Sequence, residues 1–100
     1  MNQQAMMRLR KMQKQMEEAQ ARLAATVYTG NAGGVVKVEV RGDHEILSVK
    51  IDPEAFESKD DIEMIEDSIV AALNDANKKL EKEQEEVMGQ FTGGFGGFGF

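Results

Sequence analysis

The first 25 residues carry a heptad pattern, which constrains the fold of this 100-residue chain more than any other feature. Apolar side chains recur there at alternating spacings of four and three, at Ala5, Leu9, Met12, Met16, Ala19 and Leu23. The segment is built from good helix formers and contains neither glycine nor proline, so it predicts one helix over residues 3–25. A seam this narrow becomes buried only against another helix.

A chain of this length has a small core, and a monomer would leave much of such a long amphipathic helix exposed. We therefore expect an obligate oligomer and predict a homodimer. The predicted dimer interface consists of four side chains of the seam, namely Leu9, Met12, Met16 and Leu23.

Charge is distributed unevenly along the sequence. Residues 1–25 hold five basic and two acidic side chains, whereas residues 26–100 hold seven basic and sixteen acidic ones, and the total net charge is −6. The basic side chains of the first helix are Arg8, Arg10, Lys11, Lys14 and Arg22. Two interpretations stay open: a solvated face, which could also pair with the acidic second helix of the same or another subunit, or a surface that contacts nucleic-acid phosphates. No aromatic residue lies among them, so stacking on single-stranded bases is not indicated.

The middle of the chain predicts three short antiparallel strands. Residues 26–29 are β-branched and aromatic, residues 35–41 alternate between valine and polar side chains, and residues 44–51 alternate again. A glycine-rich turn over residues 30–34 separates the first two strands, and Pro53 stops the third. The result is a meander with one apolar and one polar face.

A second long helix is predicted to begin near residues 58–60, where Ser58 and Asp61 are spaced as in a capping box. Its first half is apolar enough to cover the sheet, whereas residues 78–86 are mostly charged and should project into solvent. Gly89 is predicted to end it. The fold class is therefore α+β, with one helix–sheet–helix domain over residues 1–90 and a disordered Phe/Gly-rich tail over residues 91–100.

The sequence offers no catalytic or metal-binding set. It has no cysteine, and its one histidine, His44, belongs to a predicted turn. The Asp60–Asp61 pair is explained by helix capping, and Gly30, Gly33 and Gly34 precede a strand rather than the helix that a phosphate-binding loop requires. We expect no enzyme activity and no cofactor. No apolar run has the length of a membrane span and no secretory signal is present, so a cytoplasmic protein is expected.

Several segments together resemble the YbaB/EbfC family of bacterial nucleoid-associated proteins. They are KMQKQMEE at residues 11–18, TG at 29–30, GGVVKV at 33–38, GDH at 42–44, VKIDP at 49–53 and AALNDA at 71–76. The resemblance covers nearly the whole chain and implies a helix–sheet–helix protomer in an intertwined, tweezer-like homodimer. It also implies a cytoplasmic protein that binds double-stranded DNA with little sequence preference and acts on nucleoid organisation or gene expression.

What the resemblance implies for function is a role for the charged helical arms rather than a defined site. Because the second helix is acidic, we assign DNA contact mainly to the first helix, through the five basic residues named above. The alternative is a coiled-coil interaction module like the tentacles of prefoldin, which would expose apolar residues at its helix tips. Met1, Met6 and Met7, at the start of the chain, suit that alternative.

Overall fold

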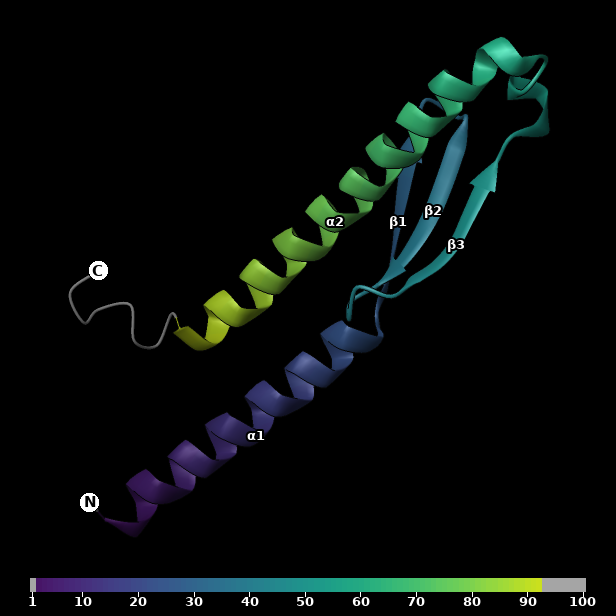
Figure 1. The fold of residues 1–100 in the computed structure, drawn as a ribbon. Helices are drawn as coiled ribbons and strands as arrows, with labels where there is room; N and C mark the ends of the chain where they lie inside the picture. The colour runs from purple at the N-terminus through teal and green to yellow at the C-terminus, as the bar shows by residue number, and fades with distance from the viewer. Residues whose placement is uncertain (1, 93–100) are drawn as a thin grey trace.

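The computed structural model describes residues 2–92 and shows two long helices and a small sheet (Figure 1). In chain order the elements are α1 (Gln3–Ala25), β1 (Val27–Ala32), β2 (Val36–Arg41), β3 (Ile46–Ile51), 3-10 turns at Pro53–Ala55 and Lys59–Asp61, and α2 (Ile62–Thr92). The strands form one antiparallel sheet in the order β1-β2-β3. Helix α2 runs along one face of this sheet, and α1 extends from one end of the sheet as an arm. The predicted α+β architecture is confirmed.

β1 is longer than the sequence indicates. Gly30 and Ala32, assigned above to the glycine-rich turn, are strand residues that pair with Val38 and Val36 of β2. The turn itself is formed by Gly33 and Gly34, whose φ angles of 54° and 75° favour glycine. The prediction of a hairpin turn is thus correct, but the predicted start of the turn is wrong. Gly30 lies within a strand, where the lack of a side chain allows close packing against α2.

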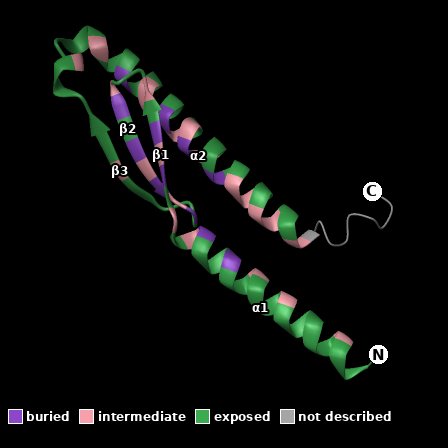
Figure 2. Ribbon diagram, turned by 180° about the vertical axis from the view of Figure 1, so that it is seen from behind, coloured by how far each residue is buried: buried purple, intermediate pink, exposed green. Residues whose placement is uncertain are grey.

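The core lies between α2 and the first two strands (Figure 2). Valines on one face of β2 pack against small and aliphatic side chains of α2, and the buried cluster consists of Tyr28, Val36, Val38, Val40, Ala72, Ala76 and Leu80. At Gly30 the two backbones approach so closely that an added Cβ would lie 1.9 Å from the carbonyl oxygen of Ala72. Hydrogen bonds from the Asn31 amide to Asp75 (3.0 Å) and from Lys79 to the Thr29 carbonyl (2.8 Å) fix α2 over β1.

Two expectations for α2 need correction. Its charged second half does not simply project into solvent, because Leu80 is fully buried and Glu83, Gln84 and Val87 are partly buried. The helix also continues through Gly89 to Thr92, since one glycine inside a helix costs only about 1 kcal/mol relative to alanine. Residues 91 and 92 of the predicted tail therefore belong to α2, and the rest of that tail lies outside the described residues.

The predicted capping box is present, but it caps the 3-10 turn Lys59–Asp61, and α2 itself begins after that turn at Ile62. Ser58 and Asp61 form the predicted capping box: the Ser58 amide donates to Asp61 (3.2 Å), and the Ser58 side chain accepts from a backbone amide of the first turn. The carboxylate of Asp61 also accepts from the amide of Glu57 at 2.9 Å. Capping thus accounts for this acidic residue, as the sequence indicated.

Helix α2 covers β1 and β2 but leaves β3 open, which corrects the expectation that it covers the whole sheet. Val49 and Ile51 of β3 pair directly with Val38 and Val36, so all four side chains lie on the same face. Val38 and Val36 are 0% and 2% exposed, whereas Val49 and Ile51 are 43% and 41% exposed. The apolar face of the sheet is therefore wider than the helix that packs on it.

Candidate nucleic-acid interface

Helix α1 is an arm that is held at its C-terminal end. Asn2 caps its first turn, accepting a hydrogen bond from the Ala5 amide at 2.8 Å, so the helix begins where the sequence predicts. Only Ala19 and Leu23 of this helix are buried, and Figure 2 shows the rest of it mostly exposed. Most side chains of the first four turns are therefore exposed to solvent in the protomer, with Ala5, Met12 and Met16 partly covered.

The joint between the arm and the sheet is built around Gly42. An added Cβ at this position would lie 1.7 Å from the carbonyl oxygen of Leu23, so only glycine allows the β2–β3 turn to approach the last turn of α1. The Gly42 amide donates to the Thr26 carbonyl at 2.8 Å, and the Thr26 hydroxyl donates to the Arg22 carbonyl at 2.7 Å. These contacts fix the direction in which α1 leaves the sheet.

The basic side chains assigned to DNA binding are all exposed along this arm: Arg8, Arg10, Lys11, Lys14 and Arg22. Across residues 2–92, ion pairs join Arg41 to Asp43 and Glu45, and Lys79 to Asp75, and none of them involves a basic residue of α1. The positive charge of the arm is therefore not neutralised by the acidic helix of the same protomer. Among the described residues the basic face does not pair with α2 of the same protomer, so a solvated face, pairing with another subunit and phosphate contact remain as interpretations.

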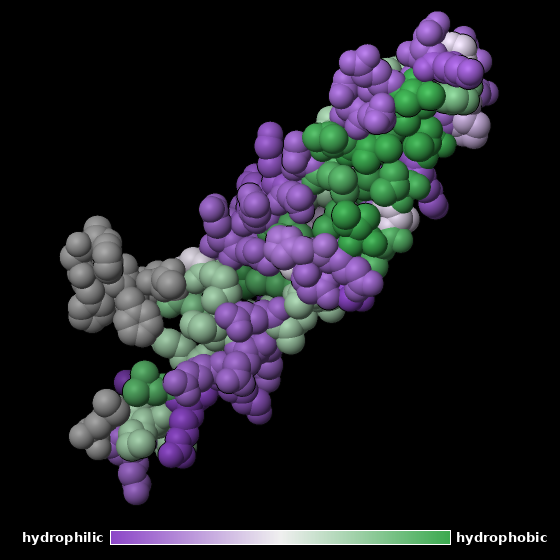
Figure 3. All heavy atoms as spheres, in the orientation of Figure 1, coloured by the Kyte–Doolittle hydropathy of each residue, from purple (hydrophilic) through white to green (hydrophobic). Residues whose placement is uncertain are grey.

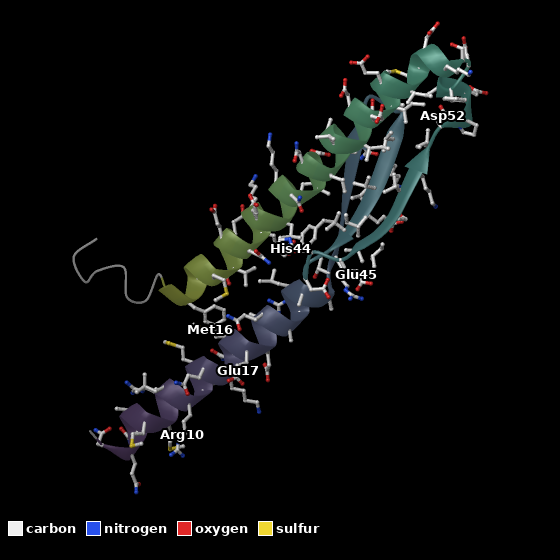
Figure 4. All side chains as sticks on the ribbon, in the orientation of Figure 1. Arg10, Met16, Glu17, His44, Glu45 and Asp52 are labelled. Carbon is white, nitrogen blue, oxygen red and sulfur yellow. The ribbon has the colours of Figure 1, made fainter. Side chains whose placement is uncertain are left out.

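The seam of α1 is covered progressively from its N-terminal to its C-terminal end. Leu9 is 44% exposed, Met12 and Met16 are half-buried, and Leu23 is 4% exposed. In Figure 4, Met16 points toward the C-terminal part of α2, and Arg10 points away from it. Leu23, placed by sequence reasoning in a dimer interface, is thus buried within its own protomer.

A cleft of about 450 Å³ separates the seam from the end of α2. It is lined by residues of both helices: Met12, Gln15, Glu18, Ala19, Arg22, Gln90 and Phe91. Arg22 therefore lies at the inner side of the arm, whereas the remaining basic residues lie nearer its free end. Arg8, Arg10, Lys11 and Lys14 form the candidate site proper, which we call the arm site.

Residues outside the arm offer no competing chemistry. His44 is exposed in the β2–β3 turn with a φ of 72°, as its turn assignment predicted. Over the described part of the chain, no group of three or more histidine, cysteine or acidic residues is placed to hold a metal ion. No helix among residues 2–92 is both long and apolar enough to cross a membrane.

Sequence reasoning missed three features of the packing: the close approaches at Gly30 and at Gly42, and the uncovered face of β3. The two glycines gave a signal, because glycine within or beside a strand marks a close approach of backbones. The partner backbone was not predictable from local sequence, since Gly30 contacts residues more than 40 positions away. The uncovered face of β3 gave no signal, because strand alternation indicates which side chains share a face but not which of them a helix covers.

The fold and the arm define a class of small helix–sheet–helix proteins in which positive charge is concentrated on one projecting helix. The chain belongs to the YbaB/EbfC DNA-binding family, whose sequence profile matches residues 1–95. This confirms the resemblance drawn from the sequence, and it makes the chain a member of a bacterial family of nucleoid-associated DNA-binding proteins.

Relatives from distant bacteria support this assignment. A nucleoid-associated protein of Chloroflexus aurantiacus is 41% identical over 99 residues, which cover 97% of this chain and 98% of the relative. Nucleoid-associated proteins of Lachnospira eligens and Legionella pneumophila are 51% and 45% identical, over 80% and 84% of this chain and 69% and 74% of theirs. A crystal structure of an uncharacterized protein from Helicobacter pylori has a TM-score of 0.62 at 27% identity, covering 80% of this chain and 93% of that one.

Proposed function

We propose that this protein binds double-stranded DNA with little sequence preference, through phosphate contacts made by the α1 arms of a homodimer. It would act in the bacterial nucleoid, within the cytoplasm, on nucleoid organisation or gene expression. The observation that carries the proposal is the charge distribution: the basic residues of α1 are exposed and outside the intramolecular ion pairs of residues 2–92, on a protein that is otherwise acidic. The nucleoid-associated relatives support the same function.

The composition of the arm site supports a mode of binding that does not depend on sequence. Arginine and lysine at a helix surface bind phosphates wherever the backbone passes, and such contacts carry no base information directly. The first half of α2 carries exposed Glu63, Glu66 and Asp67 and no basic residue, which disfavours contact with DNA, whereas exposed lysines balance the exposed glutamates over residues 78–86. We therefore assign DNA contact mainly to α1.

The homodimer is part of this proposal. In the free protomer, Leu9, Met12 and Met16 form the part of the seam that its own helices leave exposed or half-buried. Pairing of this stretch with a helix of a second copy would bury it. Leu23 is buried in the protomer beside Gly42 of the β2–β3 turn. Its role in the dimer is therefore indirect: it fixes the arm that carries the other three residues.

A gel-shift titration across salt concentrations tests the proposal. Each neutralised phosphate contributes about −0.9 to the slope of log K against log salt, so a dimer that uses part of its basic residues should give a slope of roughly −3 to −6. The Arg8→Ala/Arg10→Ala/Lys11→Ala variant should bind all duplexes more weakly and with a flatter slope.

The matched control removes three exposed lysines outside the arm, Lys37→Ala/Lys50→Ala/Lys59→Ala, which changes the net charge by the same amount. It should retain most of the affinity if the arm site binds the DNA. Equal losses in the two variants would show that only net charge matters, and unchanged binding by the arm variant would place the site elsewhere.

A prefoldin-like chaperone is the second candidate, and one observation favours it: Met6 and Met7 are 44% and 66% exposed near the free end of the arm. Exposed methionines suit binding to varied apolar surfaces. Replacing both by glutamine should leave the DNA gel shift unchanged if DNA is the ligand. If the protein instead suppresses aggregation of an unfolded reporter protein and this variant does not, the chaperone function is favoured.

A further inference from the structure

The sheet has two edge strands, β1 and β3, and the edge of β1 is hydrogen-bonded by side chains of α2. Backbone groups of alternate residues in a strand point to opposite sides, so one set pairs with the neighbouring strand and the other set faces the edge. Thr29 and Asn31 belong to the edge set, because the Thr29 carbonyl and the Asn31 amide bond to α2 side chains. Unpaired groups on an edge strand can pair with a strand of another chain.

Two side chains of α2 bond to these groups. The Asn31 amide donates to the Asp75 carboxylate at 3.0 Å, and the Lys79 ammonium group donates to the Thr29 carbonyl at 2.8 Å. Lys79 and Asp75 also form an ion pair with each other at 3.3 Å. One donor and one acceptor of the edge are therefore bonded by two side chains that hold each other in place. We call Asp75 and Lys79 the β1 latch.

Gly30, between the two latched residues, allows this contact. An added Cβ at Gly30 would lie 1.9 Å from the Ala72 carbonyl oxygen, so the backbone of α2 lies directly against the strand. The side chains of Asp75 and Lys79, one helical turn apart, can therefore reach the backbone groups at the edge. They are 40% and 52% exposed, so the latch can open locally without unfolding of the core.

The sequence of β1 does not protect its own edge. Edge strands are commonly protected by charged side chains, by proline or by a covering element, and Val27–Ala32 contains no charged residue and no proline. The exposed apolar surface does not lie at this edge either. Figure 3 shows hydrophobic side chains gathered between α2 and β3 on the viewed side of the molecule. Protection of the β1 edge therefore depends on the polar side chains of α2.

We propose that the outer edge of β1 is a strand-pairing surface that the β1 latch keeps closed, and that the strand it excludes is β1 of a second copy. Two identical edges are complementary when they pair antiparallel about a two-fold axis. With Thr29 on that axis, Val27 of each copy lies opposite Asn31 of the other, and the edge groups of both strands pair. Opening of the latch would join two sheets into one.

The latch has a consequence for assembly, which rests on the homodimer of the proposed function. A dimer carries two β1 edges, one from each protomer. Strand pairing at both edges would add dimers one after another and build an open chain of them. The β1 latch therefore restricts association to closed particles.

The first test measures the mass of purified full-length proteins by light scattering, from micromolar to millimolar concentration. Asp75→Ala/Lys79→Ala removes the latch, and its mass should rise to at least twice the wild-type mass as the concentration increases. The control, Glu81→Ala/Lys82→Ala, removes one acidic and one basic side chain from exposed positions of the same helix and should keep the wild-type mass. Equal masses of the two variants at every concentration overturn the inference.

The second test separates strand pairing from association of unfolded chains. The chain has no cysteine, so Thr29→Cys and Ser48→Cys each add a single thiol, and both positions pair with Glu39 in one row across the sheet. Paired β1 edges would bring the Cα atoms of two Thr29→Cys residues to about 4.5–5.5 Å, within the range of a disulfide.

After mild oxidation, Thr29→Cys should give several-fold more disulfide-linked pairs in Asp75→Ala/Lys79→Ala than with the latch intact. Ser48→Cys should give the same yield in both backgrounds. An unchanged yield at Thr29→Cys overturns the inference, and so does an equal increase at Ser48→Cys, which would indicate unfolded chains. DNA is absent from both tests, so their outcome does not depend on the proposed DNA binding.

Discussion

Gly30 sets the distance between β1 and α2, because the position has no side chain. The backbone of α2 occupies the space where a Cβ would lie, 1.9 Å from the Ala72 carbonyl oxygen and 2.7 Å from the Ala76 nitrogen. Neither of these atoms can move without displacing the helix. Close contact between strand and helix is what allows the small side chains of Ala72 and Ala76 to fill the core.

Gly30→Ala should therefore lower the free energy of unfolding by about 3 kcal/mol, the upper end of the usual cost of overpacking. Gly89→Ala is the matched control, because an added Cβ there meets nothing within 4 Å and the position is helical. It should raise stability by up to about 1 kcal/mol. Urea unfolding at one fixed protein concentration measures both, and similar effects of the two substitutions would contradict the packing argument.

Tyr28 is a second residue whose environment has measurable consequences. Its hydroxyl is buried without a hydrogen-bond partner among residues 2–92, and burial together with the nearby Glu83 carboxylate raises its pKa to about 12. The folded state thus disfavours the ionised form. Below pH 10, the pKa of tyrosine in the unfolded chain, the phenol is neutral in both states and the free energy of unfolding does not depend on its ionisation. As the pH rises from 10 toward 12, the unfolded state ionises first, so the free energy of unfolding falls.

Tyr28→Phe should be as stable as the wild type at neutral pH, or more stable by about 1 kcal/mol, since it removes a buried polar group without a partner. Its advantage over the wild type should grow between pH 10 and 12, where only the wild type has a phenol to ionise. Urea midpoints of both proteins at pH 7 and pH 11 measure this. A constant difference would show that the Tyr28 hydroxyl has an ordinary pKa in the folded state.

At the scale of elements, α1 shows what a sequence can and cannot reveal. Its bounds were predicted because helix propensity and the heptad spacing are local properties. Which part of its seam is covered was not predictable, since that depends on Gly42 and on the end of α2, both distant in sequence. The same reason explains why β1 was expected to stop before Gly30 and α2 to stop at Gly89.

Two identical substitutions at the two ends of the seam should have different effects. Leu23→Asp should destabilise the protomer by about 3 kcal/mol or more, because Leu23 is buried within it and the new charge has no partner. Leu9→Asp should change protomer stability by less than about 0.5 kcal/mol, because Leu9 is exposed there, while weakening the dimer. Unfolding and light scattering on both variants measure this, and equal losses of stability would contradict the one-end anchoring of α1.

At the scale of the whole molecule, charge and apolar surface are separated in space. Positive charge is concentrated on α1, acidic charge on α2, and exposed apolar side chains on β3 and the adjoining flank of α2. The charge separation could be counted from the sequence, whereas the position of the apolar surface required the packing of α2 on the sheet. The residues proposed for DNA contact and the exposed apolar side chains therefore lie on different elements.

A variant of the arm site tests whether DNA binding and dimer formation use different residues. The Arg8→Ala/Arg10→Ala/Lys11→Ala variant should lose DNA affinity and keep the dimer mass. Gel shifts and light scattering on the same samples measure both effects, and an arm variant that also dissociates would show that the two functions share a surface.

The projecting arm also changes how the protein diffuses. The described chain measures 70 × 27 × 14 Å and has a radius of gyration of 19.8 Å, whereas a compact chain of 100 residues has a radius of gyration of about 13 Å. A rod-like particle meets more hydrodynamic friction than a sphere of equal mass. A single protomer should therefore elute early from a gel-filtration column and sediment slowly for its size, so that its elution volume alone imitates a larger globular protein.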